Sequence, residues 1–359
     1  MPSIPSRFKQ ALARLAQAVG IRTVAFEVTQ DCNQDCAFCY NVWKCGPYPT
    51  GQLDTARTID LIDRIVRGYR PQVITFTGGE PLLRGDIVDL IRHASRRANC
   101  NLITNGTLMT DELARELVDA GVRTFEFTLL SADREIHNAL VRRSSFDQLI
   151  EGIASVRAAG GSVTTTFVAT KRNIDGWPDA LELNAALGVS GILFNRFNVG
   201  GAGIDSAAGL MPSTEQIRSA LAIADKGAER FGISISCGVP IPPCVVDRSP
   251  YTNVHFGECP VGTRRAYPTV DPIGNVRPCN HSATILGNLF DSDFGSILRT
   301  DAARAYASSV PDECDGCDDL RTCRGGCRAA AEVCGGCGVD PFVGLCREDR
   351  RTQECAGFV

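Results

Sequence analysis

Seventeen of the 359 residues are cysteine, and no other feature of the sequence limits so strongly what this chain can fold into. Disulfide frameworks of such density belong mainly to small secreted domains. The first 22 residues carry no secretory signal, because Arg7, Lys9 and Arg14 interrupt any apolar run, and no later segment has the roughly 18 apolar residues of a membrane span. We therefore expect a cytoplasmic protein whose reduced thiols bind metal or perform redox chemistry.

The overall composition is that of an ordinary globular protein, with 44% hydrophobic and 22% charged residues. The formal net charge is −4 and no block of Lys and Arg residues occurs, so we expect neither a nucleic-acid partner nor a membrane partner. At roughly 100–200 residues per domain, the length allows one large domain with one or two small ones.

Short β-rich segments alternate with longer helical segments between residues 23 and 195. The expected strands are Thr23–Val28, Val73–Thr77, Asn101–Thr104, Thr124–Leu129, Val163–Thr170 and Gly191–Asn195. The expected helices between them are Thr55–Gly68, Ile87–Arg97, Asp111–Ala120, Phe146–Ala159 and Trp177–Leu187. Because parallel strands need crossover connections, this alternation predicts parallel βα units in an α/β fold, as an open sheet or a barrel. Such enzymes place their sites beyond the carboxyl ends of the strands.

The remaining segments differ from this pattern. Residues 1–22 are expected to form an amphipathic helix. A glycine-rich break over Gly200–Gly209 precedes a helix that we expect from Ser213, with Gln216 as its capping-box partner, to about Phe231. Twelve of the seventeen cysteines lie after this helix, which predicts a second, cysteine-rich domain.

The first cysteine cluster follows the first expected strand directly. Cys32, Cys36 and Cys39 have the spacing C-x3-C-x2-C, and a compact loop of this kind can bring three thiolates to one metal centre. Thiolates are the usual ligands of iron–sulfur clusters. The fourth ligand is then absent, distant in sequence, or replaced by a substrate at an open position. A structural zinc site completed by Cys45 or a distant residue is the alternative.

Three motifs together resemble the radical S-adenosylmethionine (radical SAM) superfamily. The first is the cysteine cluster itself, with Phe38 as the aromatic residue before the last cysteine. The second is Gly78-Gly79-Glu80 after the second strand, which looks like the family's GGE motif. The third is the segment around Asn105, typical after the third strand. The resemblance covers about residues 23–201 and implies a partial (βα)6 TIM-like barrel.

The resemblance also implies a cofactor and a reaction. Cys32, Cys36 and Cys39 would hold a 4Fe–4S cluster whose open iron binds S-adenosylmethionine, which is cleaved reductively to a 5′-deoxyadenosyl radical that abstracts hydrogen from a substrate carbon. The glycines of the GGE motif would allow close backbone approach. Glu80 would accept charge-assisted hydrogen bonds from the cofactor's ammonium group.

Five further residues match family positions through this resemblance. Thr128 and Ser131 end the fourth strand and would contact ribose or carboxylate, although the family's Asp is missing there. Arg142 and Arg143 match a stretch in which an arginine can grip the cofactor carboxylate, the alternative being a solvated helix end. Asn195 matches the sixth-strand region on the adenine side.

The C-terminal cysteines have a regular spacing of their own. The pattern comprises Cys259, Gly274, Cys279, Cys314, Cys317, Cys323, Cys327 and Cys346. It is similar to the seven-cysteine pattern of the SPASM domain, and a double zinc ribbon is the alternative. Turn residues over Asp271–Gly274 predict a hairpin between Arg265–Val270 and Asn275–Arg277.

By this resemblance the chain holds two auxiliary 4Fe–4S clusters, three clusters in all. The first would take Cys259, Cys279 and Cys327, and the second Cys314, Cys317, Cys323 and Cys346. The first set needs an upstream ligand, for which Cys244 is expected and Cys237 is the reserve; an open auxiliary iron is the other possibility. Cys334 and Cys337 lie outside the pattern, and Cys45, Cys100 and Cys355 are expected as unligated thiols.

The expected organisation is an N-terminal helix over 1–22, the radical SAM barrel over 23–211, a linker helix and bridging region over 212–254, and the auxiliary-cluster domain over 255–359. The resemblance implies an oxidoreductase that matures a ribosomally made peptide or protein, with a flavodoxin- or ferredoxin-type reductant. Because only about 22 residues precede the first strand, a leader peptide would need a separate leader-binding protein. The alternatives are a small-molecule dehydrogenase, a tetrapyrrole-modifying enzyme, and a non-enzymatic iron–sulfur electron carrier.

Overall fold

The computed structural model describes residues 22–333 and 339–344. The helix expected over residues 1–22 lies outside this range except for Arg22. Four cysteines also lie outside it, namely Cys334, Cys337, Cys346 and Cys355. Within the described residues, no helix is both long and apolar enough to cross a membrane.

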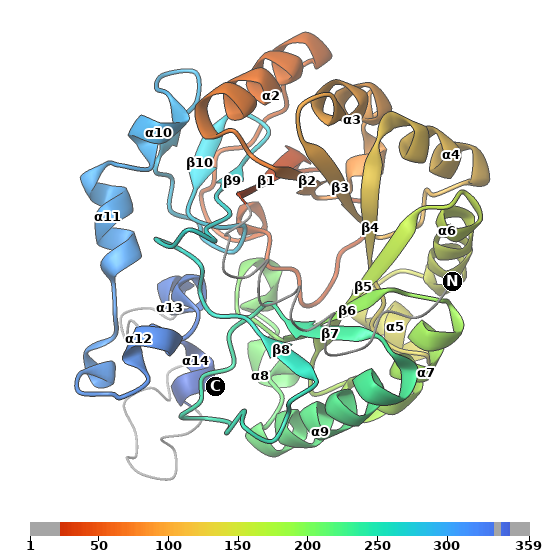
Figure 1. The fold of residues 1–359 in the computed structure, drawn as a ribbon, viewed down its shortest axis with the longest axis vertical. Coiled ribbons are helices and arrows are strands. Elements are labelled where there is room, and N and C mark those ends of the chain that lie inside the picture. Colours follow the sequence, from red (N-terminus) through yellow and green to blue (C-terminus); the bar gives the residue numbers. More distant parts are fainter. Residues whose placement is uncertain (1–21, 334–338, 345–359) are drawn as a thin grey trace.

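Six consecutive parallel strands form the wall of a partial barrel (Figure 1). They are β1 (Thr23–Thr29), β2 (Val73–Gly78), β3 (Asn99–Thr104), β4 (Val122–Thr128), β5 (Ser162–Ala169) and β6 (Gly191–Arg196). Each strand pairs in parallel with the next along the chain. All six expected strands are confirmed, and the closure of the sheet toward a ring decides for the barrel.

The crossover helices surround this wall on the outside (Figure 1). They are α2 (Thr55–Tyr69), α3 (Ile87–Ser95), α4 (Asp111–Ala120), α6 (Phe146–Ala158) and α7 (Trp177–Ala186). Side-chain caps begin two of them, because Asp54 accepts from the amide of Arg57 and Thr110 from that of Leu113. A shorter helix, α5 (Arg134–Val141), was not predicted as a separate element.

The helix after the glycine-rich break is confirmed. It is α9 (Thr214–Phe231), preceded by the one-turn helix α8 (Ala207–Leu210). The Ser213 side chain accepts from the amide of Gln216, whose side chain returns to the Ser213 backbone. The predicted capping box therefore starts this helix as expected.

The sheet continues beyond the six strands at both edges. Beyond β6 lie β7 (Ser234–Cys237) and β8 (Val254–Phe256), and both pairs are parallel. At the other edge, β9 (Thr269–Val270) pairs in parallel with β1. The outermost strands there are β10 (Asn275–Arg277), antiparallel to β9, and β11 (Gly287–Asn288), antiparallel to β10. The predicted hairpin around Asp271–Gly274 is confirmed as β9 and β10. Strands β7 and β8 were not expected in the bridging region, since three or four residues carry little pattern.

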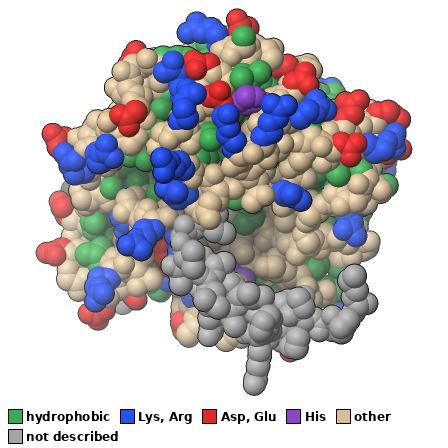
Figure 2. All heavy atoms as spheres, turned by 45° about the horizontal axis from the view of Figure 1, so that its top comes forward, with side chains coloured by type: hydrophobic (Ala, Val, Ile, Leu, Met, Phe, Trp, Pro, Cys, Tyr) green, Lys and Arg blue, Asp and Glu red, His purple; other side chains and the backbone are tan. Residues whose placement is uncertain are grey.

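The cysteine-rich region consists of short helices and loops beside the barrel (Figure 1). The helices are α10 (Phe294–Ile297), α11 (Asp301–Ser308), α12 (Leu320–Cys323), α13 (Arg328–Val333) and α14 (Pro341–Gly344). Single 3-10 turns occur at Val42–Lys44, Pro81–Leu83, Ile174–Gly176, Gly201–Gly203 and Asp312–Cys314. On the face drawn in Figure 2, basic and acidic side chains are interspersed.

Two buried ion pairs fasten this region to the barrel. Arg277 of β10 pairs with Glu27 of β1, and Arg196 of β6 pairs with Asp340 just before α14. No side chain of either pair is more than 2% exposed. Removing one partner of such a pair leaves the other charge buried without compensation, which is strongly destabilising. Both pairs therefore fix the cysteine-rich region in place.

The inner face of the barrel is polar. Along β4, Phe125 and Phe127 are buried against the helices, so the alternating residues Glu126 and Thr128 face inward. The inward Thr166 of β5 donates to Glu126 Oε1 at 2.6 Å. Burial raises the pKa of Glu126. The barrel therefore has a hydrophilic interior, and the loops that follow the carboxyl ends of its strands lie at one end of it.

Candidate iron–sulfur and cofactor site

The three cysteines of the first motif share the loop that leaves β1. Cys32, Cys36 and Cys39 are all partly buried. Burial raises the pKa of each thiol, and the charges of Cys39 and Cys32 raise the pKa of Cys36 further. Thiols that raise one another's pKa in this way lie close together and favour a cation between them, because a metal centre deprotonates a coordinating thiol.

Backbone groups around these cysteines oppose the effect of burial. Burial raises the pKa of Cys32 and Cys39, while backbone hydrogen bonds from Gln34 and Asn33 to Cys32 and from Asn41 to Cys39 lower it. Hydrogen bonds to cysteine sulfurs are one of the means by which proteins tune iron–sulfur clusters. The donor set of the loop thus fits such a cluster.

Gly78 and Gly79 bring the end of β2 against this loop. The amide of Gly79 donates to Thr29 O at 2.9 Å, and that of Glu80 donates to Asp31 O at 2.8 Å. A Cβ on Gly79 would lie 2.0 Å from Asp31 O, and one on Gly78 would lie 2.2 Å from Thr29 O. The close approach predicted for the glycines is therefore made to the cysteine loop itself.

Glu80 is buried among backbone and side-chain donors. Its carboxylate accepts from Leu82 N at 3.0 Å, Thr104 Oγ1 at 2.7 Å and Asn105 N at 2.7 Å. Burial nevertheless raises the pKa of Glu80 to about 7, and no cation of the described chain pairs with it. A carboxylate offers about four acceptor positions. One position therefore remains for a further donor.

Asn105 ties the third strand's loop to the cysteine loop. Its Nδ2 donates to Asn33 Oδ1 at 2.7 Å, and Asn33 Nδ2 donates to Thr107 Oγ1 at 2.8 Å. Asn33 follows Cys32 directly, so the motif after β3 and the cysteine motif form one hydrogen-bonded unit.

Arg142 and Arg143 reach the same loop from the end of α5. Arg142 Nη1 lies 3.3 Å from Asp35 Oδ2, and Arg143 Nη1 donates to Asn33 O. The two arginines, predicted for the cofactor carboxylate, thus have partners on the cysteine loop. Phe38 is buried in the small hydrophobic cluster beneath this loop.

The other predicted contacts lie at strand ends with local partners. Ser131 Oγ accepts from Asp133 N at 3.0 Å, next to the start of α5. Asn195 Oδ1 accepts from the amides of Gly238 and Val239 at 2.8 and 3.1 Å, which joins β6 to the segment after β7. Thr128 ends β4 on its inner side.

The three cysteines predicted for the first auxiliary set are neighbours in the structure. Burial raises the pKa of Cys279, and the nearby Cys327 and Cys259 raise it further. Arg328 Nη1 donates to Cys259 Sγ at 3.2 Å, and Asn198 Nδ2 donates to Cys327 Sγ at 3.5 Å. Three thiols with charged and polar donors around them again fit an iron–sulfur centre.

Three cysteines predicted for the second auxiliary set lie on one pocket with a fourth, unexpected cysteine. Cys314, Cys317 and Cys323 line one small pocket, and the fourth cysteine on it is Cys244. Cys244 was predicted as the upstream ligand of the first set, and the structure places it on a pocket with three cysteines predicted for the second. Cys346, the predicted fourth member, lies outside the described residues.

Comparison with known proteins assigns the family. The family model described as the Radical SAM superfamily matches residues 26–183, and the SPASM model, described as an iron–sulfur cluster-binding domain, matches residues 259–325. The chain is a radical SAM enzyme with a SPASM domain.

Curated relatives match along most of the chain, and a solved structure shares its fold. An AdoMet-dependent heme synthase from Nitratidesulfovibrio vulgaris is 27% identical, covering 86% of this chain and 88% of its own. A PqqA peptide cyclase from Xanthomonas campestris is 26% identical, covering 86% of this chain and 82% of its own. The fold resembles Streptococcus suis SuiB bound to its precursor peptide SuiA, with a TM-score of 0.68 at 14% identity over 92% of this chain and 79% of SuiB.

Other cysteines of this radical SAM enzyme are placed apart from both auxiliary sets. Cys237, the reserve ligand, packs into the hydrophobic core, where burial raises its pKa to about 12. Cys100 is buried in β3, and Cys45 is exposed. Within the described ranges, no three His, Cys, Asp or Glu side chains converge on a single metal ion, as a structural zinc site requires. An iron–sulfur cluster, being several atoms wide, holds its cysteines farther apart.

Sequence reasoning missed an aromatic contact between the two halves of the radical SAM enzyme. Tyr40, next to Cys39, stacks on His281 with ring centroids 4.0 Å apart. Asn280 donates to the Tyr40 hydroxyl at 3.0 Å, and Asn198 contacts His281 Nδ1 at 3.0 Å. Burial lowers the pKa of His281 to about 3, so the ring is neutral. Both aromatic residues lie within two positions of a predicted cysteine ligand in the sequence, and this proximity is the signal that could have indicated the contact.

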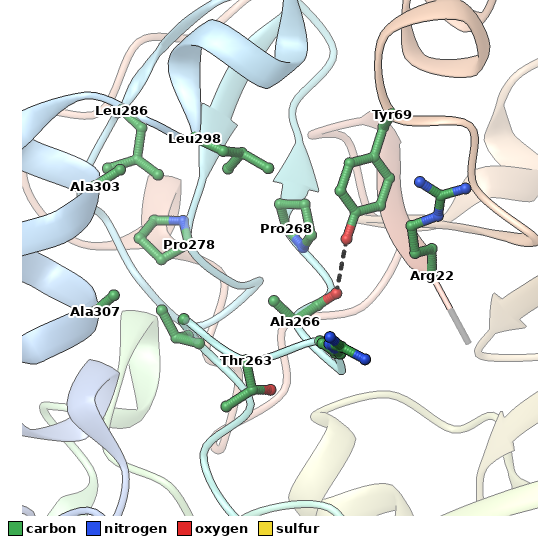
Figure 3. Close-up of a pocket in the computed structure, with 13 residues that line it drawn as sticks. Arg22, Tyr69, Thr263, Ala266, Pro268, Pro278, Leu286, Leu298, Ala303 and Ala307 are labelled. Carbon is green, nitrogen blue, oxygen red and sulfur yellow. Dashed lines mark hydrogen bonds between the residues drawn. The ribbon is translucent and has the colours of Figure 1, made fainter. Parts of the chain in front are cut away.

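A cavity of about 440 Å³ lies elsewhere, between the start of the barrel and the SPASM region (Figure 3). Arg22, Pro268, Pro278 and Leu298 line it, and the Tyr69 hydroxyl donates to Ala266 O at 3.0 Å on its wall. None of the predicted ligand or cofactor residues of the radical SAM enzyme lines this cavity.

Proposed function

We propose that this radical SAM enzyme cleaves S-adenosylmethionine reductively and oxidises a carbon of a ribosomally made peptide, with help from two auxiliary 4Fe–4S clusters. The observation that carries the proposal is the Tyr40–His281 stack, which joins the cofactor-binding cysteine loop to the first auxiliary cysteine set. A substrate at the barrel mouth would then lie between a radical source and an electron acceptor.

The described residues support the cofactor part of this proposal. When bound, the cluster on Cys32, Cys36 and Cys39 supplies the electron that releases a 5′-deoxyadenosyl radical from S-adenosylmethionine. Leu82, Thr104 and Asn105 hold the Glu80 carboxylate by three hydrogen bonds, and it keeps an acceptor position for the cofactor's ammonium group. The polar interior ending at Thr128 would receive the rest of the cofactor.

The auxiliary part rests on the two further cysteine sets. The first would be held by Cys259, Cys279 and Cys327, with Arg328 and Asn198 donating to its sulfurs. Such donors stabilise electron density on a cluster, which suits an acceptor of one electron from the substrate radical. A flavodoxin- or ferredoxin-type protein would supply the first electron.

The peptide substrate is supported by the relatives. The PqqA peptide cyclase matches along 82% of its own length, so the likeness extends over both the barrel and the SPASM region. A precursor peptide presented by a separate leader-binding protein is the partner we propose. The second candidate is action on a tetrapyrrole, which the match to the heme synthase over 88% of that protein favours.

The decisive experiment is anaerobic reconstitution with iron and sulfide, followed by reduction with dithionite in the presence of S-adenosylmethionine. We expect 5′-deoxyadenosine from the wild type and none from a variant with alanine at Cys32, Cys36 and Cys39. Wild-type protein that holds clusters but releases no 5′-deoxyadenosine would refute the enzyme function.

Iron content and substrate mass test the remaining parts. Three clusters predict about twelve irons in the wild type and about eight in the triple variant, whereas about four in the wild type would refute the auxiliary clusters. Co-expression with precursor peptides encoded near the gene should yield a peptide lighter by two hydrogen atoms. Turnover of a porphyrin with no peptide product would favour the second candidate.

A further inference from the structure

Four cysteines from two distant parts of the chain line one small pocket. Cys314, Cys317 and Cys323 come from the SPASM region, and Cys244 comes from the segment between β7 and β8. The pocket is otherwise lined by Pro242, Pro243, Asp319, Leu320, Gly325 and Val343. Thiolates are the usual ligands of iron–sulfur clusters, so four cysteines on one pocket suit such a cluster.

Cys244 stands on a rigid turn. The amides of Val245 and Val246 both donate to Pro242 O, at 3.0 and 3.1 Å, and both valine side chains are buried in the core. Arg218 of α9 donates to Val245 O at 3.1 Å. The turn that carries Cys244 is thereby fixed by the barrel's core, and Cys244 lines the pocket that the three SPASM cysteines also line.

The turn after Cys323 brings backbone amides to this cysteine. The amide of Gly326 donates to Cys323 O at 3.3 Å. Burial raises the pKa of the Cys323 thiol, and backbone hydrogen bonds from Gly326 and Gly325 oppose this rise. Arg324, Gly325 and Gly326 have φ values of 59°, 85° and 82°, so three successive residues adopt the left-handed conformation. This turn directs two amides toward one cysteine, as the loop around Cys32 does, although side-chain-bearing Arg324 adopts this conformation at a cost.

We propose that Cys244 is a ligand of the second auxiliary iron–sulfur cluster and completes a set of four thiolates with Cys314, Cys317 and Cys323. The inference rests on the proposed function, since it needs an iron–sulfur cluster in the SPASM region. It changes the expected ligand sets: the second cluster draws a ligand from the segment after β7, and the first keeps Cys259, Cys279 and Cys327. The SPASM family match begins only at residue 259 and does not include Cys244.

Alkylation of the holoenzyme tests this assignment without a variant. Reconstituted protein is treated anaerobically with iodoacetamide. A second sample is treated in the same way after its clusters have been removed with a chelator under oxidising conditions. Peptide mass spectrometry then quantifies the alkylation of each cysteine in both samples. Cys244 and Cys45 are both exposed, so Cys45 is the matched control. We expect Cys45 to be labelled equally in both states and Cys244 to be labelled at least tenfold faster after cluster removal.

The outcomes separate this inference from the proposed function. If Cys32, Cys36 and Cys39 are protected while Cys244 is labelled as fast as Cys45, the Cys244 assignment is wrong and the function stands. If Cys32, Cys36 and Cys39 are also labelled in the reconstituted protein, the proposed function itself fails.

A pair of variants gives a second test. Cys244→Ala should lower the iron content by up to about four atoms per chain and change the electron paramagnetic resonance spectrum of the reduced protein, while Cys45→Ala leaves both unchanged. A Cys244→Ala protein with wild-type iron content and spectrum, together with a Cys346→Ala protein that loses about four irons, would overturn the assignment.

Discussion

At the scale of single residues, Glu80 has both a structural role and a proposed role in cofactor binding. Its carboxylate is fully enclosed, accepts three hydrogen bonds and has a pKa raised to about 7 by burial. A buried carboxylate without a cation partner favours its protonated form. Binding of the cofactor's ammonium group would favour the ionised form, so cofactor binding and proton release from Glu80 should be coupled.

This coupling predicts a pH-dependent affinity for S-adenosylmethionine. Because the ammonium group binds ionised Glu80, affinity should rise roughly tenfold between pH 6 and pH 8, as the fraction of ionised Glu80 increases around its pKa of about 7. Glu80→Gln should bind weakly at both pH values and lose the dependence. Anaerobic isothermal titration calorimetry measures both effects.

Glu126→Gln is the matched control for this prediction. Glu126 is also buried inside the barrel, with a pKa raised by burial, but among the described residues Thr166 is its one side-chain donor. This variant should keep the pH dependence. Unchanged affinity in Glu80→Gln, or loss of the dependence in both variants, would contradict the role of Glu80.

At the scale of elements, the end of β2 and the cysteine loop are built as one unit. Gly78 and Gly79 lie so close to the loop backbone that a side chain at either position would displace it. Asn105 and Asn33 join the β3 loop to the same unit. The three motifs that identified the family are therefore also the three segments that hold one another in place.

This packing predicts that Gly79→Ala impairs cluster assembly. The added Cβ would meet Asp31 O at 2.0 Å, which forces the cysteine loop away from β2. We expect reconstituted Gly79→Ala to lose most of the iron held by the cysteine loop, about four atoms per chain. Gly85→Ala is the control, because nothing lies within 4 Å of its Cβ position. Equal iron contents in the two variants would show that the close approach does not matter.

Much of the element structure could be predicted from sequence, for identifiable reasons. The six strands and their helices follow hydrophobic patterns long enough to read, and Ser213 and Gln216 specify their helix start locally. Strands β7 and β8 could not be predicted, because their pairing depends on β6 and not on their own few residues. Cys244 was predicted with the first set, whereas it lines a pocket with three cysteines predicted for the second. Spacing along the chain carries no information about such a juxtaposition.

At the scale of the whole molecule, the two buried ion pairs determine how the SPASM region sits on the barrel. Arg196 holds α14 through Asp340, whose carboxylate also accepts from Cys327 N at 2.8 Å. Arg277 holds the β9–β10 hairpin to β1 through Glu27 and donates to Ser282 O at 2.7 Å, three residues after Cys279. Both pairs therefore connect a barrel strand to a cysteine of the first auxiliary set.

The Glu27–Arg277 pair gives a prediction about stability. Arg277→Met should lower the free energy of unfolding by about 3–5 kcal/mol, because it leaves Glu27 buried without a cation. The exposed pair of Arg115 and Glu112 is the control, and Arg115→Met should cost less than about 1 kcal/mol. Urea unfolding of the cluster-free proteins, followed by circular dichroism, measures both values.

The pH dependence of this loss identifies its cause. Burial already raises the pKa of Glu27 from 4.5 to about 6 in the wild type, and loss of Arg277 should raise it further. A folded-state pKa above the unfolded value means that the folded state binds more protons, so stability falls as pH rises from about 4.5 through the folded pKa. The deficit of Arg277→Met relative to wild type should therefore be smaller at pH 5 than at pH 8. The double variant Glu27→Met/Arg277→Met should recover part of the lost stability and remove the difference between the two pH values. If the stability deficit of Arg277→Met is equal at pH 5 and pH 8, the unpaired Glu27 carboxylate is not its cause. The lost hydrogen bonds from Arg277 to the SPASM backbone would then explain the weaker attachment.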